Sequence, residues 1–133
     1  MTIRAGLRTY LLADAAIAAI VVARVFPVTL PQSERTARRA SIVYSRISGL
    51  GDHHSGGASG LNRPRIQIDA WAPDPDTAAN LANLIKTRID GYAGAMGSVT
   101  VQGCFYADER EDYDHDLELY RVSRDFYVWF EEL

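Results

Sequence analysis

The sequence predicts an α+β domain in which a mostly antiparallel β-sheet packs against two helices. Two patterns indicate this class: helical spacing of apolar residues near both 3–11 and 74–92, and five segments rich in β-branched and aromatic residues. The chain has 133 residues, 47% of them hydrophobic and 23% charged, which suits one domain with its own core and excludes a wholly disordered chain. We therefore expect a single domain over residues 1–133, with the element order α-β-β-β-α-β-β.

The N-terminal segment predicts a helix that leads into a short strand. Asp14 is placed to cap a further helical turn over residues 15–20. The uncharged run of residues 15–23 is too short to span a bilayer, which needs about 20 residues, so we interpret the segment as an amphipathic helix. A secreted or periplasmic domain cleaved near Ala23 is the remaining alternative. The apolar helix face and the following strand consist of Ile3, Leu7, Tyr10 and Leu11, and of Val21, Val22, Val25 and Phe26 up to Pro27.

Two further strands are expected around a glycine-rich segment. The polar and basic residues 30–39 are expected to form a loop, and β-branched residues favour a strand over residues 40–48. Apolar residues alternate with polar ones along residues 65–71, which is typical of a half-buried strand. Five of the ten glycines lie within residues 49–60, so we expect a mobile loop over about residues 49–62, at the end of a hairpin.

The clearest local signal is a helix that begins after Asp74. Asp74 suits the N-cap, Pro75 suits the first helical position, and apolar residues keep helical spacing until Gly91 or Gly94 ends the helix. Strands over residues 99–106 and 119–130 follow, joined by a charged connection over residues 107–116. The last strand is apolar on both faces, so we expect helices to cover one face and a neighbouring chain to cover the other.

Charge is divided unevenly along the chain. Residues 1–65 hold nine arginines and three acidic residues, a net charge of +6, whereas residues 66–133 hold five basic and fourteen acidic residues, a net charge of −9. Such asymmetry suits contacts between oppositely charged surfaces, and it equally suits two solvated surfaces that simply differ. A sequence pI of about 5.5 argues against a general nucleic-acid binder, which needs a basic face.

No motif predicts catalysis or a cofactor. The single cysteine, Cys104, excludes an intramolecular disulfide and a CxxC zinc site, and its place in a predicted strand indicates a small buried thiol. The chain has neither a GxSxG elbow nor a phosphate-binding GxxxxGK[ST] loop. Adjacent histidines seldom face one ion, so we expect no metal site. A small metal-binding or hydrolytic module that uses His53, His54 and His115 is kept as the alternative function.

An acidic run is the strongest feature that the predicted fold does not explain. Seven acidic residues lie between Asp108 and Glu118, opposed only by Arg110. The alternating Asp112, Asp114 and Asp116 lack the glycine turn and the distant glutamate of a calcium loop. The simplest interpretation is a solvated hairpin tip.

Several segments occur in an order that is informative as a whole. They are a helix with Leu7, Leu11 and Asp14, then VARVFP at 22–27, LPQ at 30–32, IVY at 42–44, RIQIDAWA at 65–72 leading into the helix of residues 78–89, and LYRVSRDFYVW at 119–129. In this order, over nearly the whole chain, the sequence resembles the small phage tail terminator family, also called tail completion proteins. The resemblance rests on the order of the segments, because the family has no catalytic motif.

The resemblance implies a structural virion protein and not an enzyme. It implies a ring, usually a hexamer, at the head-proximal end of the tail tube, which ends tube polymerisation and joins the tail to the head connector. The implied partners are further copies of the chain, the major tail tube protein and the connector or stopper protein. DNA would pass through the channel without specific binding, and no membrane is involved. The implied location is the tail of a siphophage, a myophage or a gene transfer agent, assembled in the host bacterial cytoplasm.

Two sets of candidate residues follow from this resemblance. An acidic channel lining would repel phosphates and let DNA slide, by the reverse of the usual attraction. Arginines and exposed aromatic residues would contact a neighbouring subunit or the connector. The channel-lining candidates are Asp108, Glu109, Glu111, Asp112, Asp114 and Asp116, and the interface candidates are Arg35, Arg38, Arg39, Tyr127 and Trp129.

Overall fold

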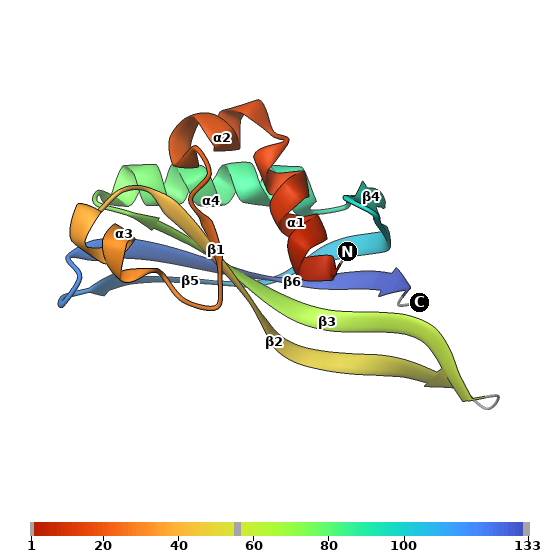
Figure 1. Ribbon diagram of the computed structural model, residues 1–133. Helices are drawn as coiled ribbons and strands as arrows, with labels where there is room; N and C mark the ends of the chain where they lie inside the picture. The colour runs from red at the N-terminus through yellow and green to blue at the C-terminus, as the bar shows by residue number, and fades with distance from the viewer. Residues whose placement is uncertain (1, 55–56, 132–133) are drawn as a thin grey trace.

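A curved six-stranded sheet carries three helices on one face (Figure 1). The computed structural model describes residues 2–54 and 57–131, with side chains described over 2–47 and 64–130. The helices are α1 (Ile3–Leu12), α2 (Ala15–Val21), α3 (Gln32–Ala37) and α4 (Pro75–Ile89). The strands are β1 (Val25–Pro27), β2 (Ser41–His54), β3 (Gly57–Ala72), β4 (Gly94–Met96), β5 (Val99–Asp114) and β6 (Leu119–Glu131).

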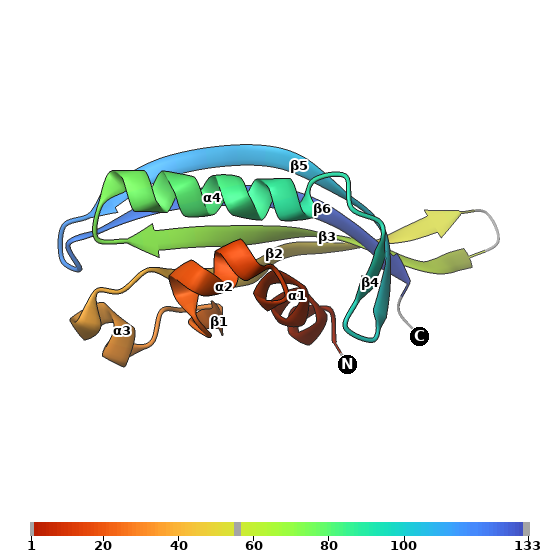
Figure 2. The same cartoon turned by 90° about the horizontal axis from the view of Figure 1, so that it is seen from above.

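The sheet is mixed, with the strand order β1-β2-β3-β6-β5-β4. β1 runs parallel to β2, and the pairings of β2 with β3, β3 with β6, β5 with β6 and β4 with β5 are antiparallel. Helices α1, α2 and α4 lie across one face, with α4 along the β6–β5 side, α2 towards β2 and α1 between α2 and β4 (Figure 2). The predicted α+β class with a mostly antiparallel sheet is therefore confirmed.

Helices α2 and α4 begin where the sequence places their caps. The Asp14 carboxylate accepts hydrogen bonds from the backbone N–H groups of Ala16 at 2.9 Å and Ile17 at 3.1 Å, and Asp74 accepts one from Thr77 N–H at 2.8 Å. These bonds satisfy backbone donors that have no partner within the helix. Gly6 lets α1 approach β4 closely, because a Cβ there would lie 2.4 Å from the carbonyl oxygen of Met96.

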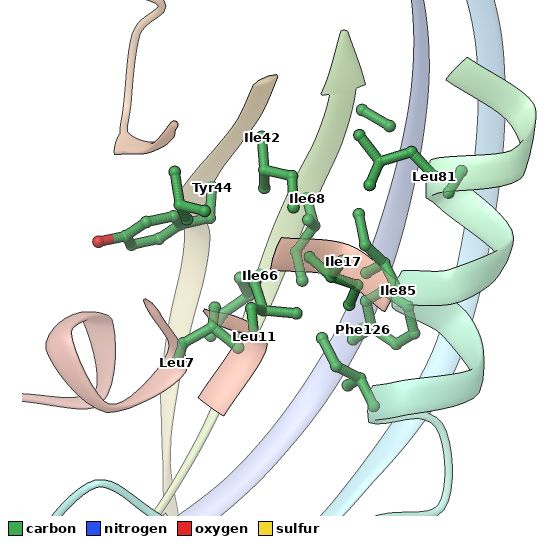
Figure 3. Close-up of a cluster of buried hydrophobic side chains, with 14 of the residues drawn as sticks. Leu7, Leu11, Ile17, Ile42, Tyr44, Ile66, Ile68, Leu81, Ile85 and Phe126 are labelled. Carbon is green, nitrogen blue, oxygen red and sulfur yellow. The ribbon is translucent and has the colours of Figure 1, made fainter. Parts of the chain in front are cut away.

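The main core fills the space between these helices and the sheet (Figure 3). Ile66 and Ile68 project from β3 and Phe126 from β6, so the predicted alternation along residues 65–71 is confirmed. The face of the sheet opposite α1, α2 and α4, which we call the outer face, carries a smaller apolar cluster beneath the α3 segment. It consists of Leu30, Val43, Trp71 and Leu119, with Phe26 and Leu117 packed against it.

Two short elements depart from the sequence-based expectations. Residues 30–39, expected as a loop, contain α3, whose N-terminus has no side-chain cap and which is held instead by the burial of Leu30. The expected strand from Val21 begins only at Val25, because Val21 ends α2 and Val22 adopts a positive φ of 60°. The three-residue strand β4 is not predicted by the sequence.

The glycine-rich segment, expected as a loop over about residues 49–62, forms strands instead. β2 and β3 continue as a paired ladder from Gly49 opposite Pro64 to His54 opposite Gly57. Glycine offers no side chain to a core, yet its backbone N–H and C=O pair as those of any residue do. The result is a long hairpin that projects beyond the helices (Figure 1). Mobility of this segment stays a prediction.

The charged segment, expected as a connection over residues 107–116, is also a strand for most of its length. β5 continues to Asp114, paired with β6 throughout, and the turn is confined to residues 115–118. The observed element order is therefore α-α-β-α-β-β-α-β-β-β. None of the helices in the described part of the chain has the length and apolar character that spanning a bilayer requires.

Cys104 is buried on β5, as the sequence predicts, and burial raises the pKa of its thiol to about 12 from an ordinary value of 9.0. The folded state therefore favours the protonated thiol. This contribution to stability is complete below pH 9.0 and is lost as the pH rises towards 12.

We expect thiol reagents at neutral pH to modify Cys104 only after denaturation. We also expect the free energy of unfolding in urea to fall less above about pH 9 in Cys104→Ala than in the wild-type protein. Equal losses in the two proteins would contradict this expectation.

Candidate assembly surface

The outer face of the sheet carries a polar network centred on a buried carboxylate. Asp125 of β6 is fully buried and accepts hydrogen bonds from Arg65 of β3, at 3.0 Å from Nε and 2.7 Å from Nη2. Arg110 of β5 donates to the same carboxylate at 3.2 and 3.1 Å. These hydrogen bonds raise the pKa of both guanidinium groups. The network therefore ties β3, β6 and β5 together by charge-assisted bonds.

The network continues along the outer face. Arg110 Nη2 also donates to Gln67 Oε1 at 3.0 Å, and Gln67 Nε2 donates to Asp69 Oδ1 at 2.9 Å. Asp108 lies 3.3 Å from Arg110 Nη1 and 3.8 Å from Arg65 Nη2. The candidate Asp108 is thus already paired with two cations of its own chain.

Cross-strand register pairs two more of the acidic candidates with arginines. Glu109 lies directly opposite Arg124, whose Nε donates to its carboxylate at 2.9 Å, and Asp112 lies directly opposite Arg121, which it binds through both carboxylate oxygens. Opposite charges in facing positions stabilise an antiparallel pair. With Arg65 beside Asp108 and Arg38 beside Glu118, the acidic run is therefore opposed by five arginines rather than by Arg110 alone.

The six channel-lining candidates do not share one surface. Successive residues of a strand point to opposite faces, so Asp108, Asp112 and Asp114 lie on the outer face and Glu109 and Glu111 on the face that carries the helices. Asp116 lies in the turn, where its backbone N–H donates to Asp114 Oδ1 at 3.0 Å. Among the described side chains, no ion pair reaches Glu111, Asp114 or Asp116.

The arginine candidates make contacts within the chain. Arg39 pairs with the buried Glu34, and Arg38 lies 3.6 Å from the carboxylate of Glu118. Arg35 donates to the carbonyl oxygen of Leu30 at 2.8 Å and to Thr29 Oγ1 at 3.0 Å. Of the three, Arg35 alone has no carboxylate partner among the described side chains.

The aromatic candidates lie on β6, on the outer face. Tyr127 lies directly opposite Phe105 of β5 in the antiparallel register. The Arg65 guanidinium lies 5.7 Å from the centre of the Tyr127 ring. Tyr127 and Trp129 are half-buried, whereas Phe105 is 54% exposed. Sequence analysis missed Phe105, although its position next to the buried Cys104 on a strand could have placed it on the opposite face.

The three histidines of the alternative function do not come together. His53 and His54 end β2 at the projecting end of the hairpin, whereas His115 lies in the β5–β6 turn at the other end of the sheet (Figure 1). His115 packs edge-on against Tyr113, with ring centres 4.9 Å apart. A site that uses all three is therefore ruled out by the topology. Across the described residues, no group of three potential metal ligands is close enough to hold an ion.

A cavity of about 360 Å³ lies beside the smaller apolar cluster, between the α3 segment and the β5–β6 turn. Its described lining offers no serine, cysteine or histidine. The lining residues are Val28, Thr29, Leu30, Arg35, Val43, Asp69, Trp71, Asp114, Asp116, Leu117 and Arg121.

Comparisons with known proteins agree with this geometry. No curated protein matches the chain. Among solved structures, a chain from the structure "Virion of native gene transfer agent (GTA) particle" is similar with a TM-score of 0.78 at 16% sequence identity, over 96% of this chain and 93% of that chain. At this identity, the likeness shows a shared fold. The model of the family "Tail completion protein gp17" matches residues 5–131. Because that match spans almost the whole sequence, the chain belongs to the tail completion protein gp17 family and has a structural role in a phage-type tail.

Proposed function

We propose that the protein forms a closed hexameric ring at the head-proximal end of the tail tube, where it ends tube polymerisation and joins the tail to the head connector. The match of the tail completion family to residues 5–131 carries this proposal. Its partners are further copies of the chain, the tube protein and the connector or stopper protein. The role is structural and involves no catalytic step.

The distribution of charge supports a ring. A ring needs heterologous contacts, in which one surface of a subunit meets a different surface of the next. Arg8 and Arg24 bind backbone carbonyl oxygens in and beside β1 at one edge of the sheet, whereas the acidic part of β5 lies towards the other edge (Figure 2). Opposite charges at the two edges favour head-to-tail contacts and oppose the pairing of like edges.

The candidate residues take separate roles in this ring. Asp114, on the outer face, and Asp116, in the adjacent turn, keep charges that no described side chain neutralises, which suits a lining that repels passing DNA. Phe105, Tyr127 and Trp129 give the outer face an apolar strip for a partner protein. Arg35, with Arg38 and Arg39 beside it, offers charge to an acidic surface of the connector or of a neighbouring copy.

Sedimentation of the purified protein over a range of concentrations tests the ring. We expect a discrete species of about 88 kDa, six times the subunit mass of 14.7 kDa. Copies of the protein in isolated particles are expected to number six at the head–tail junction. A different copy number there would contradict a hexameric ring.

A further inference from the structure

Two arginines beside β1, at one edge of the sheet, are held in place by backbone carbonyl oxygens. Arg8 donates from Nε to the carbonyl oxygen of Val25 at 3.2 Å and from Nη2 to that of Ala23 at 3.1 Å. Arg24 donates to the carbonyl oxygens of Ala40 at 2.8 Å and Ile20 at 3.0 Å. Carbonyl oxygens orient a guanidinium and leave its charge in place.

Carboxylates are scarce beside these arginines. Among the described side chains, the one ion pair that reaches Arg8 or Arg24 is that of Arg24 with Glu34, at 3.9 Å, and Glu34 is also paired with Arg39. Arg4, one turn before Arg8 on α1, is exposed and has no described ion pair. The edge therefore keeps a net positive charge.

An apolar protrusion lies beside these arginines. Val22 is 66% exposed and has a φ of 60°, a conformation that is strained for a β-branched residue. Backbone hydrogen bonds hold the turn, from Val22 N–H to the carbonyl oxygen of Ala18 and from Arg24 N–H to that of Val21, both at 2.8 Å. Backbone strain of this kind concentrates at functional positions. We name Arg4, Arg8, Val22, Ala23 and Arg24 the β1-edge patch.

The opposite edge carries a groove of complementary character. It has a volume of about 250 Å³ and lies between the first turn of α4 and strands β5 and β6. Asp76 and Glu111 line it, and no described ion pair reaches either one, whereas the third carboxylate, Asp112, is paired with Arg121. The rest of the lining is formed by Pro75, Ala78, Ala79, Tyr120, Val122 and Arg121, the partner of Asp112. We name Asp76, Ala79, Glu111 and Tyr120 the β5-edge groove.

We propose that the β1-edge patch of one copy docks into the β5-edge groove of a second copy, with Val22 in the groove and Arg4 and Arg8 facing Asp76 and Glu111. Strand order places the two surfaces at opposite edges of the sheet, so each copy offers one surface to each neighbour (Figure 2). Such a contact is heterologous and can close into a ring. This proposal rests on the ring proposed above and names its subunit contact.

Cross-linking in assembled particles tests the contact. Particles are produced in which the double variant Arg4→Cys/Glu111→Cys replaces the wild-type protein, and they are treated with a short bismaleimide cross-linker. The native thiol of Cys104 is buried and gives little background. We expect a ladder of cross-linked species from dimer upwards, and no ladder from either single variant, because each cysteine then lacks its partner.

Each other result counts against the proposal in a distinct way. A band at dimer alone would show a contact between like edges, and a protein that is present in particles but not cross-linked would overturn the docking surfaces while leaving the ring intact. Absence of the wild-type protein from particles would overturn the proposed function, and this contact with it. The matched control Arg4→Cys/Asp116→Cys, with the second cysteine in the β5–β6 turn, should give no ladder.

Charge reversal gives an independent measurement. Glu111→Lys is expected to lower incorporation into particles about three- to tenfold, because it places like charges at the contact. Adding Arg4→Glu should restore most of the loss. Asp116→Lys makes the same change of charge in the turn and should stay within about twofold of wild type. Normal incorporation of Glu111→Lys would overturn the proposed contact.

Discussion

Replacing Phe126 by alanine is expected to lower the free energy of unfolding by about 3–5 kcal/mol, because truncation of a fully buried aromatic ring is among the most destabilising single changes a core can undergo. Phe126 lies between α4 and the sheet (Figure 3) and meets the Tyr106 ring edge-on, with ring centres 6.0 Å apart. Truncation removes buried apolar area and leaves a cavity that the paired strands around it cannot close.

Urea unfolding followed by circular dichroism measures this change. Phe105→Ala is the matched control, because Phe105 lies on the neighbouring strand but is 54% exposed, and it should cost less than about 1 kcal/mol. Equal losses in the two variants would show that the core does not lie where the structure places it.

Asp125→Ala is expected to cost about 2–4 kcal/mol. The carboxylate is the common acceptor of Arg65 and Arg110, and its loss leaves the two guanidiniums with only the exposed Asp108, 3.8 and 3.3 Å away, as a shared carboxylate partner. Both arginines retain some contact with water, which limits the cost to less than that of a wholly buried charge.

The same unfolding assay, combined with substitution of the partners, isolates this network. Arg110→Ala alone should cost about 1 kcal/mol, since Arg65 still neutralises Asp125. In the double variant Arg110→Ala/Asp125→Ala the losses should be less than additive, because the two residues share one network. Full additivity would show that the carboxylate and the guanidinium act independently and would contradict the structure.

Capping chemistry and apolar periodicity made the longer helices predictable. Asp14 and Asp74 each lie immediately before a helical pattern, so the starts of α2 and α4 could be placed from sequence alone. α3 and β4 could not, because six and three residues carry too little periodicity and both elements depend on tertiary contacts.

The predictions of a loop over residues 49–62 and of a charged connection over residues 107–116 were wrong for a different reason. Hydrophobic patterning detects strands that face a core, whereas the ends of β2, β3 and β5 are held by backbone pairing and by cross-strand ions. The partners of Asp112 and Glu109 are Arg121 and Arg124, and composition alone does not show which residues face each other across a hairpin.

The candidate surfaces were predictable only in part. The division of charge along the chain corresponds to the sheet only in part, because two of the arginines that the sequence singles out, Arg38 and Arg39, pair with acidic residues of their own chain. Arg4 and Arg8, which also have no carboxylate partner among the described side chains, lie on a helix that the sequence predicts to be amphipathic. The carbonyl oxygens that hold Arg8 could not be predicted, because they belong to residues 15 and 17 positions further along the chain.

Tail length in particles that lack this protein tests its function most directly. Inactivation of the gene, with measurement of tails by electron microscopy, is expected to give tubes that exceed the normal length and remain detached from heads, because nothing then stops subunit addition or presents a surface to the connector. Restoring the wild-type gene should return tails to their normal length. Tails of normal length joined to heads in the absence of the protein would contradict its role in ending the tube.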